Sequence, residues 1–160
     1  MLECVLPSED ANHWCELDWL HPTPFLQLWR IDRADLDHYQ HTNNTSYVKQ
    51  TEQLAWAHSN ALGLTFEHYQ ALDRAMVIVH HDLHYLAPSH LNDQLACATW
   101  ITNTDKKFRL QRQFQFIQTS TNKTIFKATT DFVCVTLSTG LPKKMPESFI
   151  DAYGRACLNK

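Results

Sequence analysis

The densest run of polar chemistry in the chain is Asp35-Leu36-Asp37-His38-Tyr39-Gln40-His41-Thr42-Asn43-Asn44-Thr45-Ser46-Tyr47. It follows residues typical of a strand and opens a longer run with the spacing of a helix. Carboxylates, imidazoles and amides gathered at such a junction can bind and activate a substrate. The same residues also have ordinary structural uses, because Asn43 or Asn44 can cap a helix, Asp37 can stabilise a turn and His41 can be a solvated loop residue.

The hydrophobic pattern on both sides of this stretch predicts one strand, one long helix and four further strands. Residues 25–31 read as the first strand. Apolar residues spaced three and four apart then predict a helix from about residue 43 to Gly63, followed by a short helical turn at 65–72. The further strands are expected at residues 76–86, 95–103, 108–118 and 124–137.

The last three strands are expected to form an antiparallel meander, because polar turns at 105–107 and 120–123 separate them. Apolar residues at alternate positions of these strands predict a sheet with one face packed on a core. The long helix is the natural cover for that face, which indicates an α+β architecture in which the sheet wraps around one central helix. The residues of shared parity are Phe108, Leu110, Phe114 and Phe116, and then Ile125, Val133, Val135 and Leu137.

Composition indicates one soluble globular domain, because the 160 residues are 44% hydrophobic and 19% charged. A net charge of -3 leaves no broad basic surface, so we expect no nucleic-acid partner. No run of about 18 apolar residues occurs, so no membrane association is expected either. The N-terminal sequence lacks the pattern of a secretory signal, and we expect a cytoplasmic location.

No metal or cofactor is expected. The five cysteines are widely spaced and contain no Cys-x-x-Cys pair, which favours reduced thiols over a zinc site. His80, Asp82 and His84 share one face of a predicted strand and are candidate metal ligands. Hydrogen bonding or an oligomer contact is the favoured interpretation of these three residues.

The order Asp-x-Asp-x-x-x-His-x-Asn-Asn-x-x-Tyr within residues 35–47 resembles the acyl thioesterases of the hot-dog fold, including the 4-hydroxybenzoyl-CoA and acyl-carrier-protein (ACP) thioesterase-like enzymes. The motifs Tyr85-Leu86-Ala87-Pro88, Asp93-Gln94-Leu95 and Gly140-Leu141-Pro142 follow in the family's order. The resemblance implies a hot-dog domain at residues 25–147, with an N-terminal extension at 1–24 and a C-terminal tail at 148–160. A short helix is expected at residues 8–20 of the extension, docked through Trp14, Trp19 and Leu20.

The resemblance also implies a metal-free thioesterase that hydrolyses acyl-CoA or acyl-ACP. By its position in the motif, Asp37 is expected to act as nucleophile or general base. His41 is expected to position water, orient Asp37 or contact the substrate carbonyl, and Asn43 or nearby backbone amides to donate to the oxyanion. Tyr47 is expected to contact the substrate.

Two positions depart from the family pattern. Tyr39 stands where plant members carry an asparagine, so their asparagine-assisted chemistry is not implied. Gln40 replaces a glycine that is common in bacterial members, which bears on the backbone conformation of the loop. These departures keep open a non-catalytic acyl-binding or interaction protein of the same fold, and a hydratase or dehydratase is the less favoured enzyme.

Cations elsewhere in the chain are candidates for coenzyme A phosphates. Lys106, Lys107 and Arg109, with Lys143 and Lys144, carry this prediction, although lysines at turns are often simply solvated. The resemblance further implies a homodimer or homotetramer.

Overall fold

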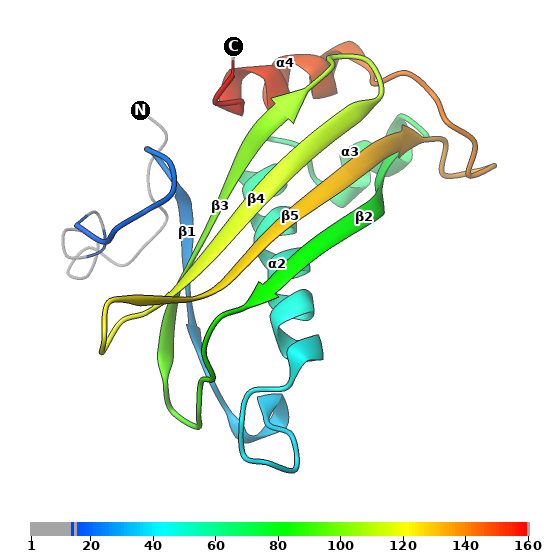
Figure 1. Cartoon of the computed structure of the whole chain (residues 1–160). Coiled ribbons are helices and arrows are strands. Elements are labelled where there is room, and N and C mark those ends of the chain that lie inside the picture. The colour runs from blue at the N-terminus through cyan, green and yellow to red at the C-terminus, as the bar shows by residue number, and fades with distance from the viewer. Residues whose placement is uncertain (1–13, 15, 160) are drawn as a thin grey trace. The chain divides into compact units, whose positions relative to one another are not determined.

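The computed structural model describes residues 14 and 16–159 (Figure 1). Five strands form one antiparallel sheet in the order β1-β3-β4-β5-β2. The strands are β1 (Phe25–Arg30), β2 (Ala75–Tyr85), β3 (Gln94–Thr104), β4 (Arg109–Gln118) and β5 (Lys123–Val135). The helices are the 3-10 turn η1 (Arg33–Asp35), the long α2 (Asn44–Ala61), α3 (Phe66–Ala71) and α4 (Glu147–Ala156). None of the helices in the described part of the chain has the length and apolar character needed to cross a membrane.

The predicted strands and the long helix are confirmed, with boundaries that agree within about two residues. β1 pairs antiparallel with β3, in a register that runs from Phe25 opposite Thr99 to Arg30 opposite Gln94. β2 follows α3 in the chain and lies at the other end of the strand order. The predicted α+β architecture is therefore correct.

Packing gathers the chain into two compact units, each with its own core. The first contains the chain up to Ala55, Leu83–Thr99 and Phe114–Ala128. Here Tyr47 of α2 stacks on Phe126, with ring centroids 5.1 Å apart, and meets Trp29 edge-on at 5.5 Å. The other buried members of this core are Ile31, Leu54, Leu95, Cys97, Phe114, Phe116, Ile125 and Ala128.

The described part of the N-terminal extension packs on this first unit. Of the helix expected at residues 8–20, residues 8–13 and 15 lie outside the described residues, Trp14 is helical, and residues 16–20 form a turn and irregular chain. Beyond the turn, the Gln115 side chain accepts the Leu20 N–H at 2.8 Å and donates to the Asp18 carbonyl at 2.9 Å. Trp14 is buried as expected, whereas Leu20 is 43% exposed.

The second unit contains Trp56–Asp82, Trp100–Gln113 and the chain from Thr129 onwards. Helix α4 contributes Phe149, Ala152 and Tyr153 to its core. The sequence patterns predict no helix here, since Pro146 at the N-cap makes no side-chain cap and the usual start signal is missing. The remaining buried members of this core are Leu64, Tyr69, Ile101, Leu110, Phe132, Cys134, Met145 and Cys157.

The parity expected for β4 is confirmed, and that for β5 holds only in part. Leu110, Phe114 and Phe116 of β4 are buried as predicted. Of the residues expected to face the core from β5, Ile125 and Val135 are buried, whereas Val133 is half-buried and Leu137 is 45% exposed beyond the strand. The opposite parity is buried as well, with Phe126, Ala128, Phe132 and Cys134. Both sets contain apolar residues, so alternation alone cannot choose the face of β5.

Candidate active site

The loop between β1 and α2 begins with a capping box around η1. Asp32 Oδ1 accepts the Ala34 N–H at 2.7 Å, and Asp35 Oδ2 accepts the Asp32 N–H at 3.1 Å. The carboxylate of Asp35 therefore satisfies a backbone donor at the start of the turn. This assigns Asp35 a structural use and leaves Asp37 as the second carboxylate of the loop.

Asp37 closes a tight turn with one of its two carboxylate oxygens. Its Oδ1 accepts the N–H groups of Tyr39 and His41 at 2.8 and 3.2 Å, and its own N–H donates to the His41 carbonyl at 2.8 Å. Gln40 completes the turn with a φ of 62°, a left-handed conformation that glycine adopts more easily. Within the described residues, Asp37 Oδ2 accepts no hydrogen bond. The role of Asp37 in stabilising the turn thus uses only Oδ1, and Oδ2 is left available to react.

Asn43 is the N-cap of α2. Its Oδ1 accepts both the backbone N–H and the hydroxyl of Thr45, at 2.9 and 2.8 Å, and its N–H donates to the Asp35 carbonyl at 2.7 Å. In the part of the chain that the structure describes, the side-chain nitrogen of Asn43 donates to no partner. The N–H groups of Thr45 and Ser46 are already bonded to Asn43. Within the described residues, the Asn44 N–H is therefore the backbone donor that this end of α2 can offer to a negatively charged oxygen.

His41 is exposed and lies against a second imidazole. Its ring meets that of His90 edge-on, with centroids 5.1 Å apart. The carboxylate of Asp93 holds His90 in place, because Oδ2 accepts the His90 N–H at 2.8 Å and lies 3.8 Å from His90 Nδ1. Gln118 Nε2 donates to the same oxygen at 2.8 Å. The sequence patterns single out no role for His90, since nothing in its neighbours shows that it reaches the loop.

Tyr47 is buried, with 3% of its surface exposed, and its hydroxyl lies 2.7 Å from Ser89 Oγ. Burial raises the pKa of Tyr47, and hydrogen bonds to Ser89 and Thr42 oppose that rise. The side chain is therefore a neutral phenol inside the first unit. Tyr47 belongs to the same compact unit as Asp37, His41 and Asn43.

The predicted phosphate-binding cations all lie in the second unit. Lys106, Lys107 and Arg109 are at the turn between β3 and β4, and Lys143 and Lys144 lie between β5 and α4. Asp105 Oδ1 organises the β3–β4 turn by accepting the N–H groups of Lys107, Phe108 and Arg109 at 2.8, 2.7 and 2.8 Å. Partial burial raises the pKa of Asp105, but these hydrogen bonds outweigh it and hold the pKa below its ordinary value. Lys106, Lys107 and Arg109 are all exposed there.

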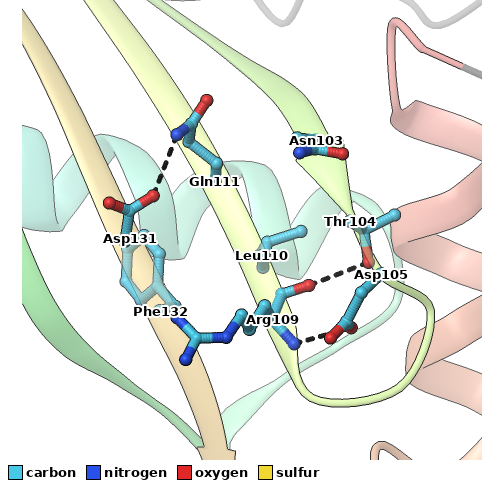
Figure 2. Close-up of a pocket in the computed structure, with 8 residues that line it drawn as sticks. All are labelled: Asn103, Thr104, Asp105, Arg109, Leu110, Gln111, Asp131 and Phe132. Atoms are coloured by element: carbon cyan, nitrogen blue, oxygen red, sulfur yellow. Dashed lines mark hydrogen bonds between the residues drawn. The ribbon is translucent and has the colours of Figure 1, made fainter.

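Figure 2 shows Arg109 among residues that line a pocket. Its volume is about 160 Å³, below the roughly 300–1,000 Å³ of typical small-molecule sites. Gln111 Nε2 donates to Asp131 Oδ1 across this pocket at 2.9 Å (Figure 2). The pocket is too small for a whole coenzyme A, and the carboxylates of Asp105 and Asp131 disfavour an anion inside it.

The candidate metal ligands on β2 face outward. His80, Asp82 and His84 are exposed, and His80 Nδ1 lies 3.4 Å from Asp131 Oδ2. Among the residues that the structure describes, no three His, Cys, Asp or Glu side chains are grouped closely enough to hold a metal ion. His80 therefore lies beside a carboxylate of β5.

A buried arginine cluster in the second unit escaped the sequence patterns. Arg112 is 1% exposed, donates to His58 Nδ1 at 2.9 Å and to Ser59 Oγ at 3.0 Å, and lies 5.9 Å from the ring centre of Tyr153. The hydroxyl of Tyr153 is hydrogen-bonded to that of Tyr69. Burial and the neighbouring guanidinium lower the pKa of His58 to about 3. Arg112 shares the core-facing parity of Leu110 and Phe114, which is the signal that marks it as buried.

Solved structures of thioesterases share this hot-dog fold. A 1,4-dihydroxy-2-naphthoyl-CoA thioesterase from Synechocystis superposes with a TM-score of 0.74 at 19% identity, covering 82% of this chain and 96% of that chain. A Staphylococcus aureus protein solved in complex with CoA gives 0.77 at 16% identity, with 86% and 88% covered. The 12:0-ACP thioesterase of Umbellularia californica gives 0.75 at 14% identity, with 89% and 56% covered.

The family is established by sequence as well. A model of the thioesterase-like superfamily matches residues 32–153, which include the loop, α2 and all strands after β1. The chain therefore belongs to the thioesterase-like superfamily. A search of curated proteins returned no significant match.

Proposed function

We propose that the protein hydrolyses acyl thioesters of coenzyme A or of an acyl-carrier protein, with Asp37 as nucleophile or general base. The observation that carries this proposal is that the two carboxylate oxygens of Asp37 differ in their hydrogen bonding. Asp37 Oδ1 is held by two backbone N–H groups, while Oδ2 accepts no hydrogen bond within the described residues. An oxygen that is oriented but not engaged is suited to attack a carbonyl or to accept a proton from water.

The remaining loop residues supply the other needs of the reaction. A thiolate leaves readily, so the main requirement beyond the attacking group is a set of donors for the oxyanion. The side-chain nitrogen of Asn43 and the backbone N–H of Asn44, at the start of α2, are candidates for this role. His41, exposed in the same loop, is proposed to orient water or the substrate carbonyl.

The solved relatives support acyl thioesters as the substrate class without choosing the carrier. One is named for a naphthoyl-CoA substrate and another for a 12:0-ACP substrate. A panel of acyl-CoA and acyl-ACP thioesters, assayed for release of the free thiol, tests the proposal directly. Binding of acyl ligands without turnover by any member of the panel would instead establish a non-catalytic acyl-binding protein.

Contact between the β3–β4 turn and nucleotide phosphates is a separate part of the proposal. Replacing Lys106, Lys107 and Arg109 together by alanine should raise KM for an acyl-CoA several-fold and leave KM for the matching acyl-pantetheine nearly unchanged. Lys123→Ala, at the first residue of β5, is the matched control and should alter neither value. Equal effects of the triple substitution on both substrates would remove phosphate recognition from the turn.

We further propose that two copies associate through β2. This strand ends the strand order, and its exposed side chains include Val77, Ile78 and Val79, with exposures of 38%, 44% and 55%. An apolar sheet edge of this kind favours pairing with another strand. Sedimentation should show at least a dimer, and Val79→Lys should shift it towards monomer, whereas Leu28→Lys on β1 should not. A wild-type monomer at assay concentration would contradict the proposal.

A further inference from the structure

We propose that Ser89, which no sequence motif singles out, is a positioning residue that holds His41 and Asn43 in place through Thr42. The inference rests on the proposed thioesterase function and adds to it a residue from another part of the chain. Ser89 lies in the connection between β2 and β3, and its surface is fully buried. Thr42, the residue between His41 and Asn43, is 5% exposed.

Ser89 binds Thr42 through both its backbone and its side chain. The Ser89 carbonyl accepts the Thr42 N–H at 2.9 Å and the Thr42 hydroxyl at 3.1 Å. The two side-chain oxygens lie 2.6 Å apart. Such a set of contacts fixes the position of Thr42 far more tightly than a single hydrogen bond between flexible side chains would.

The Ser89 hydroxyl also reaches the helix that follows the loop. Tyr47, on the first turn of α2, places its hydroxyl 2.7 Å from Ser89 Oγ. The raised pKa of Tyr47 keeps the phenol protonated, so it can donate to Ser89. One serine therefore ties together the end of the loop and the start of α2, the two elements that carry the proposed catalytic groups.

The turn transmits this restraint to Asp37. Thr42 forms an isolated antiparallel bridge with Leu36, and the His41 carbonyl accepts the Asp37 N–H. Fixing Thr42 thus fixes the closing side of the turn that orients the Asp37 carboxylate. A shift of about 1 Å in such groups can cost up to about 10²-fold in rate, even when the substrate still binds.

The test is steady-state kinetics on Ser89→Ala with the best thioester of the panel. We expect kcat to fall about 10-fold while KM changes less than about twofold, because the lost hydroxyl orients reacting groups and does not bind substrate. Thr42→Val, which keeps shape but removes the hydroxyl, should reproduce this fall, and Thr42→Ser should restore most of it. Ser138→Ala, at an exposed serine bonded to Asp73, is the matched control and should leave kcat unchanged.

Combining Ser89→Ala with Thr42→Val should lower kcat by less than the product of the two separate effects, because both substitutions remove the contact between the two side chains. Each also removes one contact of its own, to Tyr47 or to the Ser89 carbonyl. A stable Ser89→Ala protein with wild-type kcat would overturn the inference, as would a loss of kcat that follows only the fraction of unfolded protein. If the proposed thioesterase function is wrong, the wild-type protein will release no thiol from any thioester of the panel. If the wild type hydrolyses a thioester and Asp37→Asn lowers kcat while Ser89→Ala does not, only the role of Ser89 is rejected.

Discussion

Asp37→Asn is expected to lower kcat for thioester hydrolysis by about 10²-fold or more. The substitution removes the negative charge that attacks the carbonyl or takes the proton from water. It keeps a side-chain oxygen that can still accept the N–H groups of Tyr39 and His41, which are bonded to Asp37 Oδ1 in the structure. The turn should therefore persist, and the loss should belong to the chemistry.

The measurement is turnover of the wild type and variant on the same thioester, together with thermal unfolding and sedimentation. Asp35→Asn is the matched control, because Asp35 acts in the capping box and is expected to change stability more than kcat. Near wild-type turnover in a folded Asp37→Asn protein would falsify the assignment of Asp37.

The largest effect on stability is expected at Arg112. Arg112→Ala should lower the free energy of unfolding by about 3–5 kcal/mol, because it leaves a cavity and removes the donors to His58 and Ser59. No carboxylate of the described residues pairs with the guanidinium, so its buried charge is compensated by neutral acceptors and the Tyr153 ring. Arg112→Met, which fills more of the same volume without a charge, should cost less, as measured by urea unfolding.

The same cluster predicts a dependence of stability on pH. His58 has a pKa of about 3 in the folded protein, lowered first by burial and then by Arg112, against an ordinary value of 6.5. Between these values the unfolded chain binds a proton that the folded chain does not, so this contribution is complete above 6.5 and is lost as the pH falls towards 3. Arg112→Met should weaken that acid dependence. A steeper loss in the variant would contradict this account of His58.

The parts of the fold that follow from local patterns are predictable from the sequence. The strand boundaries and the start of α2 come from periodicity and from a capping residue, and Asn43 does cap α2. The choice of face in β5 is not predictable in this way, since both parities are apolar and only packing decides. α4 escapes prediction because its N-cap lacks a side-chain signal.

The same distinction between local and distant contacts applies to the candidate site. The loop motif indicates Asp37, His41 and Asn43, because these residues are neighbours in sequence. Ser89 is separated from Thr42 by 47 positions, and a serine after a proline carries no sign that it will meet a buried threonine. Arg112 has the parity of a core residue, but its charge argues for exposure until His58 and Ser59 are seen beside it.

In the part of the chain that the structure describes, three free cysteines are buried, and they provide a separate chemical reporter for each unit. Cys97 belongs to the core of the first unit, and Cys134 and Cys157 belong to the core of the second. Burial raises the pKa of Cys97 and Cys134, so neither thiol ionises readily in the closed state. Because alkylation requires an accessible thiolate, each cysteine can react only when its surroundings open. Comparing the labelling rate of Cys97 with those of Cys134 and Cys157 therefore tests whether the two units open together or one before the other.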